Sequence, residues 1–167
     1  MLNGFGCVQS WDTAVKAGAG HDASACATFY WRDGAHYLVD MLVVRLEYPQ
    51  LKRAIMQQAE RFAPEGIVIE DKASGQSLLQ DLRQESSLPL IAYMPKGDKV
   101  GRFVRITPML EAGLLHLPKH ASWLAALEQE LFSFPDGAHD DQVDAISQYL
   151  NWQRDRARQA RPNLRRI

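Results

Sequence analysis

Acidic residues stand at three widely separated places in this chain, each beside a run of apolar residues. Asp12 follows an apolar stretch, and Glu70 ends the apolar run at residues 67–70. A third group comes much later, at Asp140, Asp141 and Asp144. Carboxylates held together at the ends of apolar runs repel one another unless a cation lies between them. Divalent metal ions, which prefer oxygen ligands, are the natural candidates, so the pattern predicts a two-metal phosphodiester-cleaving enzyme if the three places meet.

The late aspartate group carries the strongest local signal. Three aspartates within five positions at a helix start are more than helix capping requires. Asp140 is placed to cap the helix, and Asp141 or Asp140 can each share a helical face with Asp144. Asp144 stands among apolar residues, so we expect its carboxylate to face the protein. The competing interpretation is a solvated acidic helix start, which the helix dipole also favours.

A basic segment follows the middle acidic place. Its members are Lys96, Lys99, Arg102 and Arg105. The last three recur every three residues and so approximate one helical face, which suits the phosphates of DNA. A solvated basic face explains the same spacing. The chain contains no phosphate-binding loop of the GxxxxGK[ST] type, so we do not expect it to hydrolyse ATP by itself.

Other catalytic signatures are weak in this sequence. Cys7 and Cys26 lie in apolar contexts outside any CxxC pair, which favours buried, reduced thiols. His116 and His120 have helical ligand spacing, but Pro118 lies between them and favours a loop. No Ser-His-Asp or Cys-His arrangement stands out.

The elements that must position these residues follow from hydrophobic periodicity. Strands are predicted at residues 5–11, 23–31, 36–45, 66–70, 88–94 and 114–117. Helices are predicted at residues 48–62, 74–84, 98–112, 122–131 and from 140 to about 153. The first three strands form an antiparallel meander with a turn at Asp33-Gly34, and helices and strands then alternate. This order predicts an α/β fold whose mixed sheet is antiparallel at one side and parallel at the other.

The length of the chain favours one domain, and the charge distribution sets its C-terminal end apart. Residues 1–153 are predicted to form the domain, and residues 154–167 a basic tail. The tail holds six arginines and one aspartate, a local charge of +5 against −6 for the remainder. Such a tail suits attraction to a phosphate backbone, or is simply disordered. Strand-like sequence begins almost at once, which suggests a domain taken from a longer chain. No signal peptide or membrane-spanning run is present, so no membrane partner is expected.

Five segments together resemble a known family. They are residues 9–14 (QSWDTA), 69–75 (IEDKASG), 98–102 (DKVGR), 111–113 (EAG) and 134–145 (FPDGAHDDQVDA). In this order they are similar to the C-terminal nuclease domain of phage terminase large subunits. The similarity runs from about residue 4 to residue 152, and the last segment is the most specific.

The resemblance implies a ribonuclease H-like fold, with a five-stranded mixed sheet flanked by helices. It also implies metal-dependent cutting of double-stranded DNA at the start and end of genome packaging. Family members carry an N-terminal ATPase domain, assemble on the portal ring and work with a small terminase subunit. The expected location is the cytoplasm of a bacterial host that carries the phage or prophage.

The family's metal ligands map onto Asp12, Glu70 and the cluster from Asp140 to Asp144. Asp141 is the first choice within that cluster, with Asp140 and Asp144 close behind. The resemblance therefore predicts two Mg²⁺ or Mn²⁺ ions, bridged by Asp12 and completed by Glu70 and the late aspartates.

The basic residues are then expected to hold the DNA. Lys72 is placed to steady a phosphate or the attacking water, and Arg102 and its neighbours to hold the backbone. Three alternatives stay open: a junction-resolvase-like or integrase-like nuclease on the same fold, a non-catalytic DNA-translocation or portal-docking module, and a small-molecule phosphohydrolase.

Overall fold

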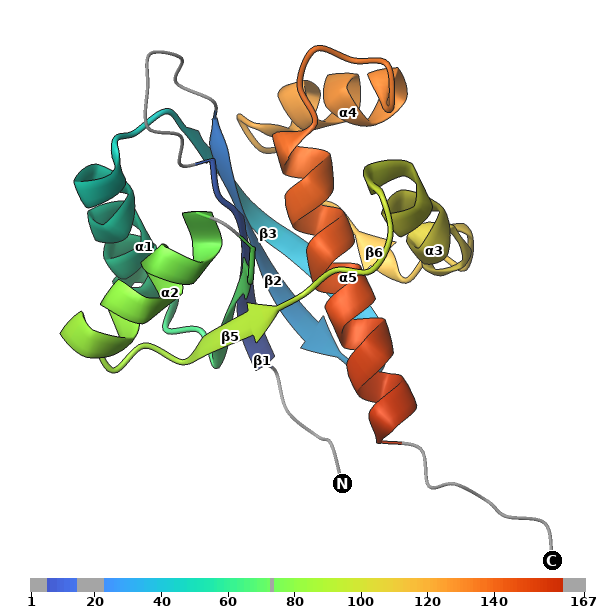
Figure 1. The fold of residues 1–167 in the computed structure, drawn as a ribbon. Helices are drawn as coiled ribbons and strands as arrows, with labels where there is room; N and C mark the ends of the chain where they lie inside the picture. Colours follow the sequence, from blue (N-terminus) through green and yellow to red (C-terminus); the bar gives the residue numbers. More distant parts are fainter. Residues whose placement is uncertain (1–5, 15–22, 73, 161–167) are drawn as a thin grey trace, which may run out of the picture.

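A six-stranded mixed sheet forms the centre of the molecule, with helices on both of its faces (Figure 1). The computed structural model describes residues 6–14, 23–72 and 74–160. The strands are β1 (Gly6–Asp12), β2 (Ser24–Arg32), β3 (Ala35–Val44), β4 (Gly66–Glu70), β5 (Leu90–Tyr93) and β6 (Leu115–His116). The helices are α1 (Tyr48–Phe62), α2 (Ser74–Glu85), α3 (Lys99–Glu111), α4 (Leu124–Ser133) and α5 (Asp141–Gln159).

The strands lie in the order β5-β4-β1-β2-β3-β6. The first three form the predicted antiparallel meander, which reverses at Asp33 and Gly34, both with positive φ. β4 lies parallel to β1 and β5 parallel to β4, as expected for the alternating half. The mixed sheet is confirmed, with one strand more than the five expected. The extra strand is β6, a two-residue segment parallel to β3. A hydrogen bond from the backbone N–H of His36 to the carbonyl of Leu114 joins the two strands.

The predicted helices all form, and the largest difference is the end of α5. This helix ends at Gln159 rather than near Gln153. Its additional turns still pack on α3, because Arg154 donates to the carbonyl of Arg105 and Asp155 accepts from the Arg105 guanidinium. Residues 161–167 of the predicted basic tail lie outside the described residues.

The two faces of the sheet bury different sets of side chains. On one face α1 and α2 pack on Trp11, Ile67 and Ile69, which are fully buried. On the other face α5 crosses the sheet next to Val8 and Val68, with α3 and α4 packed around it (Figure 1). Burying each large apolar side chain contributes about 1.5–3 kcal/mol, so both layers anchor the central strands firmly.

Two further predictions from the sequence can be compared with the structure. Cys7 and Cys26 are both buried and free, as expected for reduced thiols. Among the residues that the structure describes, no helix combines the length and apolar character needed to cross a membrane.

Candidate functional site

Asp12 and Glu70 end two neighbouring parallel strands at the same edge of the sheet. Trp11 of β1 pairs in register with Ile69 of β4, so the two acidic residues follow one another side by side. Side chains alternate across a strand, and Val68 packs in the cluster under α5. Glu70 therefore points to the α5 side of the sheet, and Asp12 does so by the same alternation from Val8.

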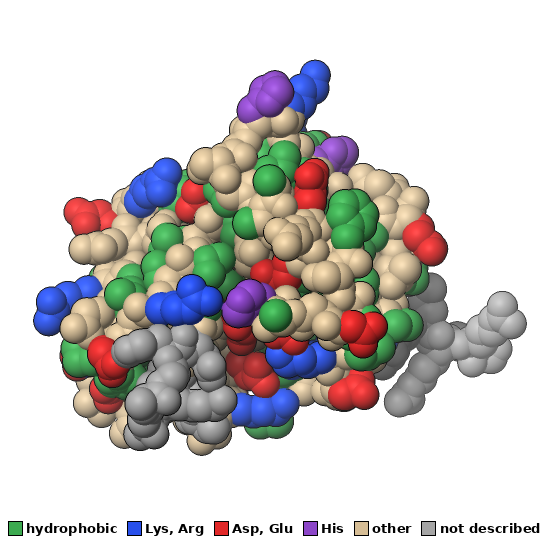
Figure 2. All heavy atoms as spheres, turned by 90° about the horizontal axis from the view of Figure 1, so that it is seen from above, with side chains coloured by type: hydrophobic (Ala, Val, Ile, Leu, Met, Phe, Trp, Pro, Cys, Tyr) green, Lys and Arg blue, Asp and Glu red, His purple; other side chains and the backbone are tan. Residues whose placement is uncertain are grey.

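Helix α5 brings the third acidic group to this edge. The Gln148 side-chain amide anchors the helix to the ends of β1 and β4. Its nitrogen lies 3.0 Å from Ser10 Oγ, 3.1 Å from the carbonyl oxygen of Trp11 and 3.3 Å from that of Val68. Asp144 stands one helical turn before Gln148 and Asp141 two turns before it, so both project from the same side of the helix. The three acidic places predicted from the sequence thus meet at one edge. Figure 2, which looks down on this edge, shows acidic side chains gathered beside basic ones.

The start of α5 is held by a residue that the sequence patterns did not single out. Glu130 of α4 is buried, and its carboxylate accepts hydrogen bonds from the backbone N–H of Val143 at 2.9 Å and from Gln142 Nε2 at 2.8 Å. It thus serves as the cap that was predicted for Asp140. Asp140 occupies the N-cap position, but its side chain makes no capping hydrogen bond.

The environment of Asp12 opposes its negative charge. Burial, followed by the neighbouring carboxylates of Asp144, Asp141 and Glu70, raises the pKa of Asp12 from 3.8 to about 8, although Lys99 acts in the opposite direction. Within the described part of the chain, no hydrogen bond or ion pair reaches the Asp12 carboxylate. A buried carboxylate surrounded by others is the electrostatic condition that a cation relieves.

Burial also opposes the negative charges of the two aspartates on α5. Burial raises the pKa of Asp141, and the nearby carboxylates of Glu130 and Asp140 add to the effect. Burial also raises the pKa of Asp144, although its contacts with Lys99 and Arg102 lower it. The α5 carboxylates therefore differ, because Asp144 has cationic partners that compensate part of the cost of burial.

A family comparison agrees with this arrangement. The family model described as the terminase RNaseH-like domain matches residues 9–152, which include all three acidic places. The chain belongs to this family. No curated protein sequence matches it.

Solved structures similar to this terminase RNase H-like domain come from phages and from human cytomegalovirus. The large terminase of a thermophilic bacteriophage, in complex with ADP, superposes with a TM-score of 0.69 at 14% identity. The match covers 90% of this chain and 40% of that one, so the chain spans about two fifths of that ADP-bound terminase. The large terminase nuclease of thermophilic phage G20c with bound magnesium has a TM-score of 0.68 at 13% identity, covering 88% of this chain and 81% of that one. The manganese-soaked, inhibitor-bound human cytomegalovirus terminase nuclease domain has a TM-score of 0.61 at 12% identity, covering 90% and 84%.

Two basic residues of α3 lie between the acidic groups of this terminase domain. Lys99 Nζ lies 2.8 Å from Asp140 and 2.7 Å from Asp144. The Arg102 guanidinium lies 3.5 Å from Asp144 and 3.8 Å from Glu70. These distances show that both residues contact the carboxylates, with the Arg102 side chain enclosed and the Lys99 side chain partly exposed.

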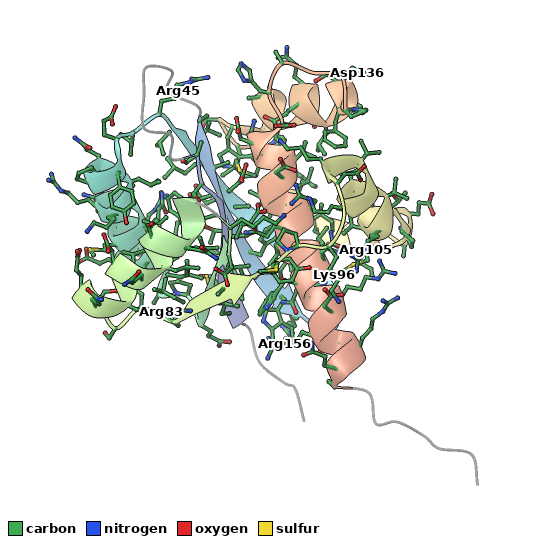
Figure 3. All side chains as sticks on the ribbon, in the orientation of Figure 1. Arg45, Arg83, Lys96, Arg105, Asp136 and Arg156 are labelled. Carbon is green, nitrogen blue, oxygen red and sulfur yellow. The ribbon has the colours of Figure 1, made fainter. Side chains whose placement is uncertain are left out.

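The other predicted DNA-binding residues are more spread out. Lys72 pairs with Glu70 at 3.2 Å, at the margin of the site. Arg105 instead pairs with Asp155 and donates to the backbone carbonyl of the exposed Lys96, and Figure 3 shows these two basic residues together beside α5. Asp155 lies eleven residues beyond Asp144 in α5, about 16 Å along the helix axis. The structure therefore places Lys96 and Arg105 away from Asp144 and the other candidate metal ligands.

The residues present fit divalent ions by their chemistry, although the ligands are not assembled around one point. The candidate metal ligands are carboxylates, which suit hard cations. Within the described residues, the charge on the Asp12 carboxylate has no direct partner. Among those residues, no three acidic, histidine or cysteine side chains are close enough together to hold one ion. Lys99 contacts Asp140 and Asp144, and Arg102 lies between Asp144 and Glu70.

Proposed function

We propose that this chain is a metal-dependent endonuclease domain that cuts double-stranded DNA during phage genome packaging. The observation that carries the proposal is the meeting of carboxylates from β1, β4 and α5 at one edge of a terminase RNase H-like fold. The metal-bound and metal-soaked nuclease structures of similar fold support it.

Asp12, Glu70 and the aspartates of α5 would hold two Mg²⁺ or Mn²⁺ ions. When bound, such ions activate a water molecule and stabilise the leaving oxygen of a phosphodiester. Asp12 is the central ligand of this proposal because Asp144, Asp141 and Glu70 all act on its charge. Asp141 and Asp144 lie in the first turn of α5, and both act on the charge of Asp12, so we include both as ligands, with Asp140 at the margin.

The basic residues around the carboxylates would receive the DNA backbone. Lys72, Lys99 and Arg102 already contact the acidic group, so a phosphate placed there would meet three positive charges. Lys96, which precedes α3, and Arg105 of α3 would contact the duplex further from the cut. Contacts with phosphates carry no base information, so we expect low sequence specificity.

The remaining partners follow from the family. An N-terminal ATPase domain in the full-length protein would drive the DNA, and the portal and a small terminase subunit would position it. The phage terminase of which this chain spans about two fifths was solved with ADP bound. The expected location is the cytoplasm of an infected bacterial cell.

Plasmid cleavage in Mn²⁺ tests the proposal. Asp12→Asn should abolish cutting while leaving the circular dichroism spectrum unchanged, because the substitution keeps the shape of the side chain but removes its charge. Asp33→Asn is the matched control, since it makes the same change at the exposed β2–β3 turn. Cutting by Asp12→Asn at the rate of the control would contradict the proposal.

A second function is favoured by one observation. Lys99 and Arg102 already neutralise part of the acidic group, as expected of a degenerate site in a DNA-translocation or portal-docking module without catalysis. Calorimetric titration separates the two functions. No heat of binding at millimolar Mn²⁺ or Mg²⁺ would favour the docking module, and saturable binding that Asp12→Asn weakens would favour the nuclease.

A further inference from the structure

Lys99 contacts two carboxylates at the start of α5 with a single amine, as Lys52 of α1 does with two carboxylates of α2. Its Nζ lies 2.8 Å from both oxygens of Asp140 and 2.7 Å from Asp144 Oδ2. Burial lowers the pKa of Lys99, but the hydrogen bonds to Asp140 and Asp144 outweigh this and leave it raised. The amine is therefore a charged partner of the α5 carboxylates.

The backbone that carries Lys99 is fixed. Asp98 caps α3, with its Oδ1 accepting from the backbone N–H of Gly101 at 2.7 Å. A Cβ at Gly101 would lie only 2.7 Å from that same oxygen, so glycine keeps the cap close. Arg102 lies one turn after Asp98, and its backbone carbonyl accepts a hydrogen bond from Asn151 of α5 at 2.9 Å. The start of α3 is thus tied to α5, and the side chain of Lys99 is the part that can move.

Lys99 and Arg102 differ in their freedom. The Lys99 side chain is 50% exposed and has a flexible aliphatic stem. The Arg102 side chain is 12% exposed, and its guanidinium lies between Asp144 and Glu70. Turning Lys99 toward solvent requires no rearrangement of the core, whereas Arg102 is enclosed.

The contacts of Lys99 involve the oxygens that a metal ion would need. Lys99 takes Asp144 Oδ2 and both oxygens of Asp140, and Arg102 faces Asp144 Oδ1. Both oxygens of Asp144 therefore already have a cationic partner. A divalent ion that uses these carboxylates competes with the Lys99 amine for the same oxygens.

We propose that Lys99 is an exchangeable cation: it neutralises Asp140 and Asp144 before metal and DNA arrive, and moves to a backbone phosphate when a divalent ion takes the carboxylates. This inference rests on the proposed nuclease function. Because linkage is reciprocal, DNA that binds Lys99 tightens metal binding, and metal tightens DNA binding. The site would thus bind metal less tightly until a duplex is present.

Calorimetric titration of Mn²⁺ into the metal-free chain tests the first half of the exchange. Lys99→Met keeps the length of the stem and removes the competing amine, so Mn²⁺ should bind more tightly, on the order of tenfold, within the range usual for coupled sites. Lys99→Arg retains the charge and should bind Mn²⁺ no more tightly than the unmodified chain. Lys119→Met is the matched control, because it removes one charge from an exposed lysine with no ion pair to the described residues. Equal affinity of Lys99→Met and the control would overturn the exchange.

The second half concerns the duplex. Repeating the titration with a saturating phosphorothioate duplex, which resists hydrolysis, should tighten Mn²⁺ binding to the unmodified chain. The same duplex should tighten binding to Lys99→Met much less, because the exchanging amine is gone. An equal gain for both proteins would overturn the transfer of Lys99 to a phosphate.

The outcomes separate this inference from the proposed function. If neither protein binds Mn²⁺ with or without duplex, the metal site itself is refuted and the exchange with it. If both bind Mn²⁺ with the same affinity and the same response to the duplex, the metal site stands and the role of Lys99 is refuted.

Discussion

The two faces of the central sheet use the same strands for different purposes. Under α1 and α2, Trp11, Ile67 and Ile69 form a dry apolar layer. Under α5, the same strands begin with apolar contacts and end in Asp12 and Glu70. One residue step along β1 leads from a fully buried tryptophan to a carboxylate whose pKa is raised to about 8. The difference teaches that the apolar face supplies stability, which allows the other face to hold charges that repel one another.

Buried polar groups lie on both faces, since Gln9 of β1 donates to the carbonyl of Gln58 in α1, and three of them hold α5 in place. Gln148, Asn151 and Glu130 all serve the α5 side, where they fix helix ends and strand ends through hydrogen bonds. Directional bonds of this kind hold a helix in one position, which apolar packing alone specifies less sharply. Each variant below changes a residue on one face of the sheet, and the measurements show whether stability, metal binding or both are affected.

The largest expected effect lies on the apolar face. Ile55→Ala removes a fully buried side chain between α1 and the sheet and should lower the free energy of unfolding by about 2–5 kcal/mol. Urea denaturation measures this loss, and Ile55→Val should cost only about 0.5–1.5 kcal/mol. Mn²⁺ affinity of the folded protein should not change in either variant. A change in affinity would show that the two faces are not independent.

The next effect lies at the start of α5. Glu130→Ala leaves the backbone N–H of Val143 and the Gln142 amide without their acceptor, and should cost about 1–3 kcal/mol of stability. Mn²⁺ affinity should fall as well, because the turn that carries Asp141 loosens. Glu128→Ala, on the exposed side of the same helix, is the control and should leave both quantities nearly unchanged. Loss of stability with unchanged Mn²⁺ affinity would show that the hydrogen bonds of Glu130 do not influence the metal site.

A smaller effect depends on pH. The folded-state pKa of Asp12 is raised from 3.8 to about 8, so its contribution to stability is complete below the unfolded pKa and is lost as the pH rises toward 8. Asp12→Asn carries no such charge. The metal-free variant should therefore gain stability relative to the unmodified chain, by about 1 kcal/mol between pH 6 and pH 7. Urea unfolding at both pH values in the presence of a chelator measures the gap. A gap that does not change with pH would mean that Asp12 is not opposed by burial and its neighbours.

The smallest effect compares two adjacent carboxylates. Glu70→Gln should weaken Mn²⁺ binding, because Glu70 faces α5 and acts on the charge of Asp12. Asp71→Asn should leave the affinity unchanged, since Asp71 follows on the opposite side of the strand and is absent from the charges acting on Asp12. If Glu70→Gln and Asp71→Asn lose the same Mn²⁺ affinity in calorimetric titrations, the two sides of the strand do not differ in metal binding here.

Much of this architecture could be predicted from the sequence, because local patterns determine it. The strand-like runs of β1 and β4 each end in an acidic residue, which was enough to expect Asp12 and Glu70 at strand ends where a site could form. The helical spacing over 48–62 matches α1 as observed. The two-residue strand β6 was recognised as a strand, yet the family resemblance suggested a sheet of five.

Contacts between distant segments could not be predicted in the same way. The repeat of Lys99, Arg102 and Arg105 suggested one basic face, but carboxylates of α5 divide it, with Asp144 facing the first two and Asp155 the last. Glu130 carries no local signal, because its partners become neighbours only when α4 packs on α5. The pairing of helices decides these roles, and a single sequence does not encode that pairing in any local spacing.

A crystal structure of the chain soaked in Mn²⁺, with anomalous difference density, tests the central claim most directly. The account predicts manganese peaks between Asp12, Glu70 and the aspartates of α5, with Lys99 turned away from Asp140 and Asp144. Anomalous density absent from this edge, with Lys99 still bound to both carboxylates at saturating Mn²⁺, would contradict it.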